Sequence, residues 1–250
     1  MQIFRNSQPV EATRGNPSFV WRAGQERRLS MTRAACDLEG RRVLDLGCGL
    51  GTYMTAFQRH TPHVFGLDVE LERLQTAHSN GIRGMVDAVG ERMPYADDTF
   101  DVVFSNEVLE HVTDDRATVA EVVRILRPGG RAVIFVPNRL YFFETHGIYR
   151  NGVYEFGNKL LVNWLPDRWR NKLAPHVRAY TERGLRDLFL GTNSRVVRLT
   201  QVFAGFDNIV KRHGAAGRVL RNIWQGMERT PMRLFGLSHL IVVEKLTLRV

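Results

Sequence analysis

Short apolar segments and longer amphipathic segments follow one another in a regular order over the first 137 residues. The short apolar segments predict buried strands at 42–46, 63–67, 84–86, 100–104 and 131–136. Longer segments with apolar residues at helical spacing predict helices at 18–38, 51–59, 70–80 and 115–126. Strands that alternate with helices predict a parallel sheet covered by helices on both faces.

The regular order ends at Pro137, and residues 138–180 are rich in aromatic side chains. Most of these aromatics are expected to fill the core of an added layer. Trp164 and Trp169 stand in a mixed apolar and charged segment, which is more typical of an interface. We therefore interpret 138–180 as an aromatic insert that could line an acceptor pocket.

The last seventy residues return to a more regular pattern. Thr181 predicts the N-cap of a helix that runs to Leu190. Two further strands are predicted at 195–202 and 240–246, and a basic, helical excursion at 208–237 lies between them.

The segment 43–51 carries the clearest chemical signal, because it reads Val-Leu-Asp-Leu-Gly-Cys-Gly-Leu-Gly. A strand runs into a turn with three glycines, and glycine lets the backbone approach a ligand closely. The next strand ends in Asp68, 21 residues after Gly47. A Rossmann-like unit places its ribose-binding acid at an offset of roughly 20 residues. The sequence therefore predicts a nucleoside site.

Four blocks in register support a family resemblance, with a fifth, Asn106–Val112, between the last two. The four blocks are 43–51, Gly66–Val69, Met93–Asp101 and Leu126–Gly130. From Val43 to Pro137 the chain resembles class I S-adenosylmethionine-dependent methyltransferases of the ubiquinone/menaquinone-pathway type. The resemblance implies an α/β fold with a Rossmann-like, doubly wound, seven-stranded and mostly parallel sheet whose last strand is antiparallel. It also implies S-adenosyl-L-methionine as the cofactor.

The resemblance also implies roles for individual residues. Gly47, Gly49 and Gly51 would form the turn under the methionine portion of the cofactor. Asp68 would accept both ribose hydroxyls, and Asp45 would orient the turn and the cofactor's amino group. The implied cofactor-binding set is Asp45, Gly47, Cys48, Gly49, Gly51, Asp68, Val69, Asp87, Met93, Ser105 and Asn106.

Three further assignments complete the set. Met93 would pack on the adenine, and Ser105 and Asn106 would lie beside the methionine and the transferred methyl group. Structural alternatives stay open for the two acids near the turn, because Asp45 could cap the turn and Asp68 could cap the helix at 70–80.

One position departs from the family pattern. The acid that usually bonds the adenine amino group is replaced by Val89, and the nearest acid before it is Asp87. Either the loop bulges to bring Asp87 to the adenine, or backbone groups near Gly90 take that role.

Methyl transfer from a sulfonium is an in-line displacement, with the nucleophile held about 3 Å from the methyl carbon. An alcohol or amine acceptor can need a general base. His111 is the leading candidate, although it could instead anchor the loop after the fourth strand. The insert supplies His146 and Tyr141 as further catalytic candidates, with His176 and Tyr180 comparable.

The absence of certain motifs narrows the range of possible methyl acceptors. Residues 105–108 read Ser-Asn-Glu-Val rather than the signature of enzymes that methylate base amines, and no cysteine follows Cys48. No Cys/His cluster has metal-ligand spacing, so no metal site is expected. An oxygen, nitrogen or carbon nucleophile on a small-molecule, lipid-like or sugar acceptor remains.

Charge is concentrated in the last hundred residues. Residues 151–250 hold 17 basic and 7 acidic side chains, a net charge of +10, whereas residues 1–150 have a net charge of −1. This distribution favours attraction to an anionic membrane or a phosphorylated substrate, with nucleic acid less favoured, or is simply a solvated basic face. The N-terminus lacks a secretory signal and no apolar run reaches about 18 residues, so we expect a cytoplasmic location, with peripheral membrane contact open.

Two other functions stay open at this level. A nicotinamide-dependent oxidoreductase requires G-x-G-x-x-G, but Thr52 occupies the position of its last glycine. A fold retained as a non-catalytic module that binds RNA or another partner is the second alternative. The oligomeric state is not predicted.

The expected organisation is a single domain over 1–250. An N-terminal arm and helix at 1–38 could close as a lid, and the cofactor-binding core follows at 39–137. The aromatic insert occupies 138–180, and the C-terminal half of the sheet occupies 181–250.

Overall fold

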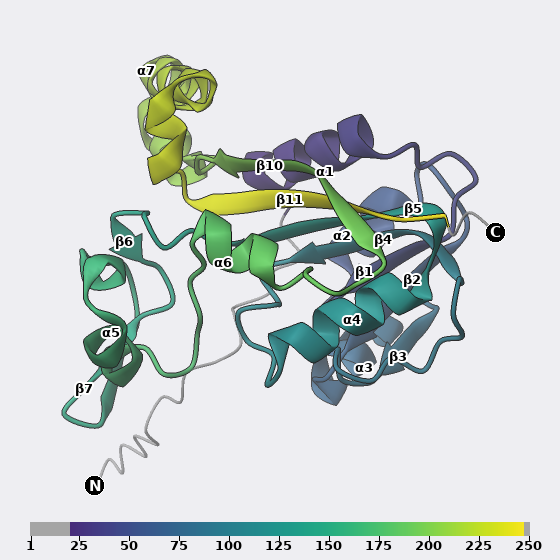
Figure 1. Ribbon diagram of the computed structural model, residues 1–250. Coiled ribbons are helices and arrows are strands. Elements are labelled where there is room, and N and C mark those ends of the chain that lie inside the picture. The colour runs from purple at the N-terminus through teal and green to yellow at the C-terminus, as the bar shows by residue number, and fades with distance from the viewer. Residues whose placement is uncertain (1–20, 248–250) are drawn as a thin grey trace, which may run out of the picture.

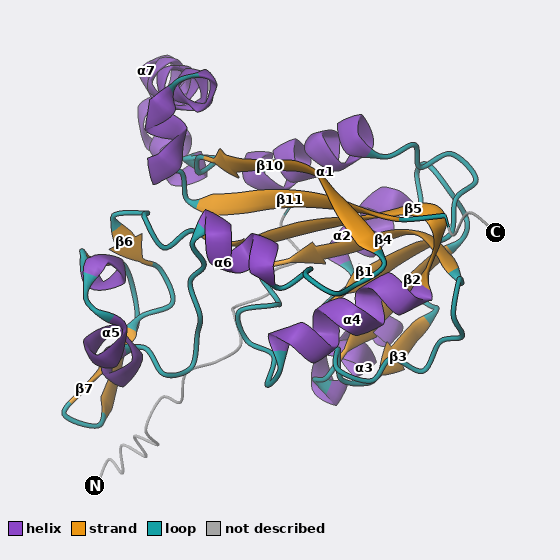
Figure 2. Ribbon diagram, in the orientation of Figure 1, coloured by secondary structure: helices purple, strands orange, loops and turns teal. Residues whose placement is uncertain are grey.

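A seven-stranded sheet forms the centre of the computed structural model, and helices cover both of its faces (Figure 1, Figure 2). The structure describes residues 21–247. The predicted arm at 1–18 therefore lies outside the described residues, as does the start of the helix predicted at 18–38.

The strand order is β10-β11-β5-β4-β1-β2-β3. Neighbours from β5 to β3 pair in parallel, whereas β11 runs antiparallel to both β5 and β10. The predicted sheet, with its antiparallel last strand, is thus confirmed. The strand bounds are β1 (Val43–Leu46), β2 (Val64–Asp68), β3 (Met85–Asp87), β4 (Phe100–Asn106), β5 (Leu126–Pro137), β10 (Ser194–Val202) and β11 (Ser238–Lys245).

The helices begin close to the residues that the sequence indicates. The Asp114 side chain accepts a hydrogen bond from the Ala117 N–H at the start of α4, and Thr181 caps α6 through the Gly184 N–H. The bounds are α1 (Ala23–Ala35), α2 (Thr52–Phe57), α3 (Leu71–Ser79), α4 (Asp115–Ile125), α6 (Glu182–Asp187) and α7 (Asp207–Gly226), followed by the 3-10 turns η2 (Met227–Arg229) and η3 (Pro231–Phe235).

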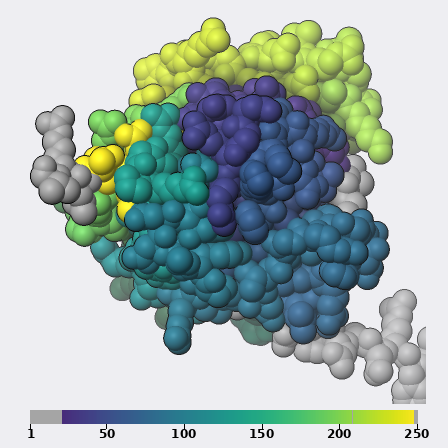
Figure 3. Space-filling view, turned by 90° about the vertical axis from the view of Figure 1, so that its right-hand side faces the viewer, coloured from purple at the N-terminus to yellow at the C-terminus, as the bar shows by residue number. Residues whose placement is uncertain are grey.

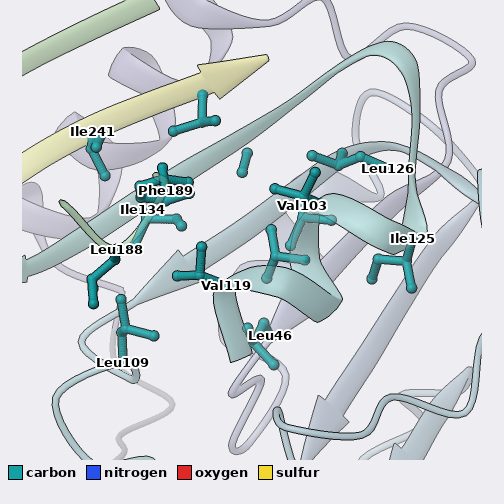
Figure 4. Packing of buried hydrophobic residues seen from close by; sticks show 14 of the residues in the cluster. Leu46, Val103, Leu109, Val119, Ile125, Leu126, Ile134, Leu188, Phe189 and Ile241 are labelled. Carbon is teal, nitrogen blue, oxygen red and sulfur yellow. The ribbon is translucent and has the colours of Figure 1, made fainter. Parts of the chain in front are cut away.

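Alternate residues of the central strands enter two separate cores. In β5, Ile134 packs on the face covered by α4 and α6, whereas Val133 and Phe135 pack on the face covered by α1 and α2. Figure 4 shows the first of these cores, with Val119 of α4 and Leu188 beyond α6 close to strand side chains. The continuous apolar runs in the sequence follow from this two-sided burial.

The insert is a small unit of its own, at the same end of the sheet as α7 (Figure 1). The buried Arg170 side chain donates to Glu144 Oε2 at 2.6 Å and to the Val177 carbonyl at 2.9 Å. This ion pair ties two ends of the insert together. Its elements are β6 (Phe143–Glu144), β7 (Ile148–Arg150), β8 (Val153–Glu155), β9 (Lys159–Leu160), η1 (Val162–Trp164) and α5 (Asp167–Leu173).

Arg170→Met should lower the free energy of unfolding by about 3 kcal/mol, because it leaves the Glu144 carboxylate buried without its cation. Adding Glu144→Gln should restore part of the loss. Arg168→Met, at an exposed neighbouring position, should change stability by less than about 0.5 kcal/mol. Denaturant unfolding measures all of these variants. A loss below about 1 kcal/mol for Arg170→Met would show that the pair does not hold the insert together.

Candidate active site

A cavity of about 510 Å³ opens at the edge of the sheet where the parallel strands end. Its walls come from the turn after β1, the end of β2, the loop at 89–91, the loop after β4, helix α1, and the segments around 202–207 and 237. Parallel strands place their carboxyl ends on one edge, where α/β folds bind ligands. The size falls in the range of small-molecule sites.

Backbone hydrogen bonds hold the glycine turn against the end of β2. The N–H groups of Gly47 and Cys48 both donate to the Leu67 carbonyl, at 2.7 and 3.0 Å, and Gly49 N–H donates to Asp68 Oδ2 at 2.8 Å. Gly47 has a φ of +75°, and a Cβ there would lie 2.2 Å from a methyl carbon of Val108. The turn therefore needs glycine at 47 both for its backbone conformation and for space.

The two predicted acids have different surroundings. Asp68 lines the cavity, and its Oδ1 accepts the Glu70 N–H at 2.9 Å. Glu70, not Asp68, is the N-cap residue of α3. Asp45 is fully buried beneath the turn with Oδ2 unpartnered. Burial and the nearby Asp68 carboxylate raise the pKa of Asp45 well above its usual range.

The structure brings half of the predicted site residues to the cavity. The lining includes Gly47, Cys48, Gly49, Asp68, Val69, Asn106 and His111. The residues of the predicted set that do not line it are Asp45, Gly51, Asp87, Met93 and Ser105, with the catalytic candidates Tyr141 and His146. Their roles stay predictions.

The two sequence alternatives for the adenine amino group differ in their access to the cavity. Val89 and Gly90 line the cavity, whereas Asp87 is exposed and outside the lining. Met93 is buried in the core, and its N–H donates to Glu121 Oε2 at 2.7 Å. This geometry favours backbone groups near Gly90, rather than the Asp87 carboxylate, as partners for an adenine.

Helix α1 contributes a cation that sequence reasoning missed. Arg28 donates to Asn106 Oδ1, to Glu107 Oε1 at 2.9 Å and to Ser238 Oγ at 2.9 Å. Its guanidinium also lies 5.1 Å from the ring centroid of Phe135. A guanidinium in a cavity wall could bind a carboxylate such as that of an amino acid. No local motif marks Arg28, because only the fold carries α1 across the strand ends.

Glu107 is held in an uncommon conformation beside Arg28. Its φ is +56°, and Ser238 Oγ donates to its Oε1 at 2.8 Å. Although burial acts in the opposite direction, Arg28 and His146 keep the pKa of Glu107 below its usual value. A strained backbone beside a partly buried carboxylate in a cavity wall is typical of functional sites.

A second cluster lies behind Glu107, where ligand atoms of Glu110, His111 and His146 all fall within 4.8 Å of one another. His146 Nδ1 lies 3.1 Å from Glu144 Oε1, and His111 Nδ1 lies 3.3 Å from the His176 carbonyl. These contacts leave the Nε2 atoms available, so the three residues could hold a divalent cation. Sequence spacing could not indicate this cluster, because His146 comes from the insert.

Burial shifts the pKa values of Glu110 and His111. Burial, and then the neighbouring Glu107, raise the pKa of Glu110 well above its usual value. Burial, and then the neighbouring His146, lower the pKa of His111 to about 4. His111 is therefore a neutral imidazole at pH 7.

The cavity fits the cofactor that the resemblance implies. The bare backbone at Gly47 admits close approach, and Asp68 faces the cavity with lone pairs left after two N–H bonds. Arg28 supplies a cation for a carboxylate, and Asp45 has an unpartnered oxygen beneath the turn. The residues present therefore match the ribose and the amino acid portion of S-adenosylmethionine.

Comparison with known proteins agrees with this geometry. A family model described as a methyltransferase domain matches residues 44–134. Ubiquinone biosynthesis O-methyltransferases from Mesorhizobium japonicum and Aeromonas salmonicida are 33% and 34% identical over 139 and 108 residues. These matches cover 54% and 41% of this chain and 53% and 45% of the relatives, so the chain spans about half the length of the curated relatives it matches.

A solved structure extends the likeness in fold. The S-adenosylmethionine-dependent methyltransferase from Mesorhizobium loti superposes with a TM-score of 0.63 at 18% identity, covering 91% of this chain and all of that chain. The comparisons do not favour an oxidoreductase or a non-catalytic module. Residues 44–134 are thus similar to a methyltransferase domain, and the fold of the chain is similar to that of a solved S-adenosylmethionine-dependent methyltransferase.

Proposed function

We propose that this protein transfers a methyl group from S-adenosylmethionine to a nucleophile on a small-molecule acceptor. The observation that carries the proposal is one cavity whose wall contains the glycine turn, the Asp68 carboxylate and the Arg28 guanidinium. These groups match three parts of one cofactor. The relatives that are O-methyltransferases support oxygen as the acceptor atom, with nitrogen and carbon as alternatives.

The residues of this chain would bind and orient both reactants. S-adenosylmethionine supplies the activated methyl group when it is bound. Asp68 would accept its ribose hydroxyls, and Asn106 would lie beside its methionine portion. His111, neutral at pH 7, would accept a hydrogen bond from an acceptor hydroxyl at Nε2 and hold its oxygen in line. Helix α1 would exclude water from this side of the cavity, which is the lid role expected of 1–38.

The acceptor is proposed to be a lipid-like or sugar molecule. No described residue of the insert lines the cavity, whereas residues 202–205 and Asp207 do, which supports these residues as the acceptor wall. The net charge of +10 in residues 151–250 supports peripheral contact with an anionic membrane. Among residues 21–247, no helix is long and apolar enough to cross a membrane.

Asp68→Asn should weaken S-adenosylmethionine binding by about 10- to 100-fold, because charged hydrogen bonds to two hydroxyls are lost. Isothermal titration calorimetry measures the effect. Asp37→Asn, on the exposed surface, is the matched control and should bind as the unsubstituted protein does. Asp87→Asn tests the alternative adenine partner and should have little effect. Unchanged affinity in Asp68→Asn would remove this residue from the site.

Gly47→Ala should lower cofactor affinity at least tenfold, because the added methyl group meets Val108 and the positive φ is strained. Gly129→Ala is the control, since Gly129 has a φ of +78° with open space around it. It should keep its affinity within about twofold. Adding Val108→Ala to Gly47→Ala should recover part of the loss. Full affinity in Gly47→Ala would contradict the proposed approach of the cofactor.

Methyl-labelled S-adenosylmethionine, incubated with the protein and fractionated host extract, tests the function itself. Label is expected in the lipid or small-molecule fraction and should be strongly reduced with Asp68→Asn. Label confined to RNA or protein would overturn the acceptor class. Cofactor binding without any transfer would favour the non-catalytic alternative.

A further inference from the structure

The second half of α7 folds back on the first and is oriented by its contacts with the body. Gly214 has a φ of 52° and a ψ of −117°, which breaks the helix. Gly217 is packed so closely that a Cβ there would lie 2.7 Å from the Ile209 carbonyl oxygen. The ring of Trp224 lies 5.6 Å from that of Phe203. One side of residues 215–226 therefore faces the body, and another must face away.

An apolar stripe lies on a side that faces solvent. Ala216, Val219, Leu220 and Ile223 follow the i, i+3, i+4, i+7 spacing of one helix face. The exposed fractions of Val219, Leu220 and Ile223 are 59%, 40% and 60%. These four residues, the α7 stripe, are an unusual feature, because such a helix face normally packs against a core.

The stripe belongs to a purely cationic segment. Residues 208–227 contain no Asp or Glu and carry Lys211, Arg212, Arg218 and Arg221. In Figure 1, α7 projects from the body beside the ends of β10 and β11, and in Figure 3 this yellow-green segment forms the top of the molecule. A cationic amphipathic helix on the outside of a protein has the character of an interfacial helix.

The segments on both sides of α7 form part of the cavity wall. Phe203, Gly205 and Asp207 line the cavity before the helix begins, and Leu237 lines it after η3. Both carboxylate oxygens of Asp207 accept hydrogen bonds from the first turn of α1. A surface bound by α7 would therefore lie next to the part of the cavity wall that Phe203, Gly205, Asp207 and Leu237 form.

We propose that the α7 stripe docks on the surface of an anionic lipid bilayer. The inference rests on the proposed function, because docking would bring a lipid-like acceptor to the cavity. The apolar side chains enter the interface, and the arginines and lysine remain at the level of the anionic head groups. A second copy of the chain is a poorer occupant, because a two-fold contact would place cationic segments against each other.

Co-sedimentation with vesicles tests the proposal, using phosphatidylcholine with or without phosphatidylglycerol at physiological salt. The full chain should bind the anionic vesicles at least tenfold more strongly than the neutral ones. Arg218→Gln/Arg221→Gln should weaken this binding about thirtyfold, and Val219→Ser/Ile223→Ser at least tenfold.

Two matched pairs control for charge and for apolar surface elsewhere. Arg33→Gln/Arg59→Gln removes the same charge from other exposed positions, and Leu190→Ser/Val197→Ser removes exposed apolar side chains away from α7. Both pairs should keep vesicle binding within about threefold. Thermal unfolding of every variant identifies any that fail to fold. If Val219→Ser/Ile223→Ser does not fold, the single variant Leu220→Ser replaces it.

Several results would overturn the proposal. In the first, the protein binds neutral vesicles as strongly as anionic ones. In the second, the control pairs lose vesicle binding as the α7 pairs do. In the third, both α7 pairs bind anionic vesicles as strongly as the unsubstituted protein. Self-association that only Val219→Ser/Ile223→Ser abolishes, without vesicle binding, would make a second copy the occupant. If the protein binds an RNA probe but not vesicles, the proposal is equally overturned. Vesicle binding requires neither cofactor nor acceptor, so its failure is distinguishable from a failure of methyl transfer.

Discussion

The site depends on the way in which three backbone N–H groups bind the glycine turn to the end of β2. The Leu67 carbonyl accepts from Gly47 and Cys48, and the Asp68 carboxylate accepts from Gly49. These bonds satisfy buried donors that the turn cannot pair within itself. They also fix the Asp68 side chain, so the turn and the Asp68 carboxylate in the cavity wall form one unit.

Buried negative charge is the second constraint. Asp45, Asp68 and Glu110 are buried at or behind this edge of the sheet, and Glu107 beside them is partly buried. A group of carboxylates is costly to bury without cations. Arg28 supplies such a cation from α1, bonding to Glu107 and Asn106. A helix that precedes the first strand is therefore part of the site as well as its cover.

The cavity is formed partly by the region that matches the methyltransferase domain and partly by segments outside that region. Residues 44–134 match the methyltransferase domain, and they contain the glycine turn, Asp68 and the loop after β4. The cavity wall at 202–207, the insert and α7 lie outside that match. The cavity wall thus combines residues of the matched region with segments outside it, among them Arg28 of α1, residues 202–205 and Asp207.

The sequence by itself determined the sheet, the order of its elements and the glycine turn. Apolar runs such as 131–136 predict strands buried on both faces, and the steric freedom of glycine is a local property. The tertiary structure alone decided which side chains meet. It brought Arg28 from α1 and His146 from the insert to Glu107 and Glu110, and it left Asp87 outside the cavity. Contacts between segments distant in sequence depend on how whole elements pack, and no local pattern encodes that packing.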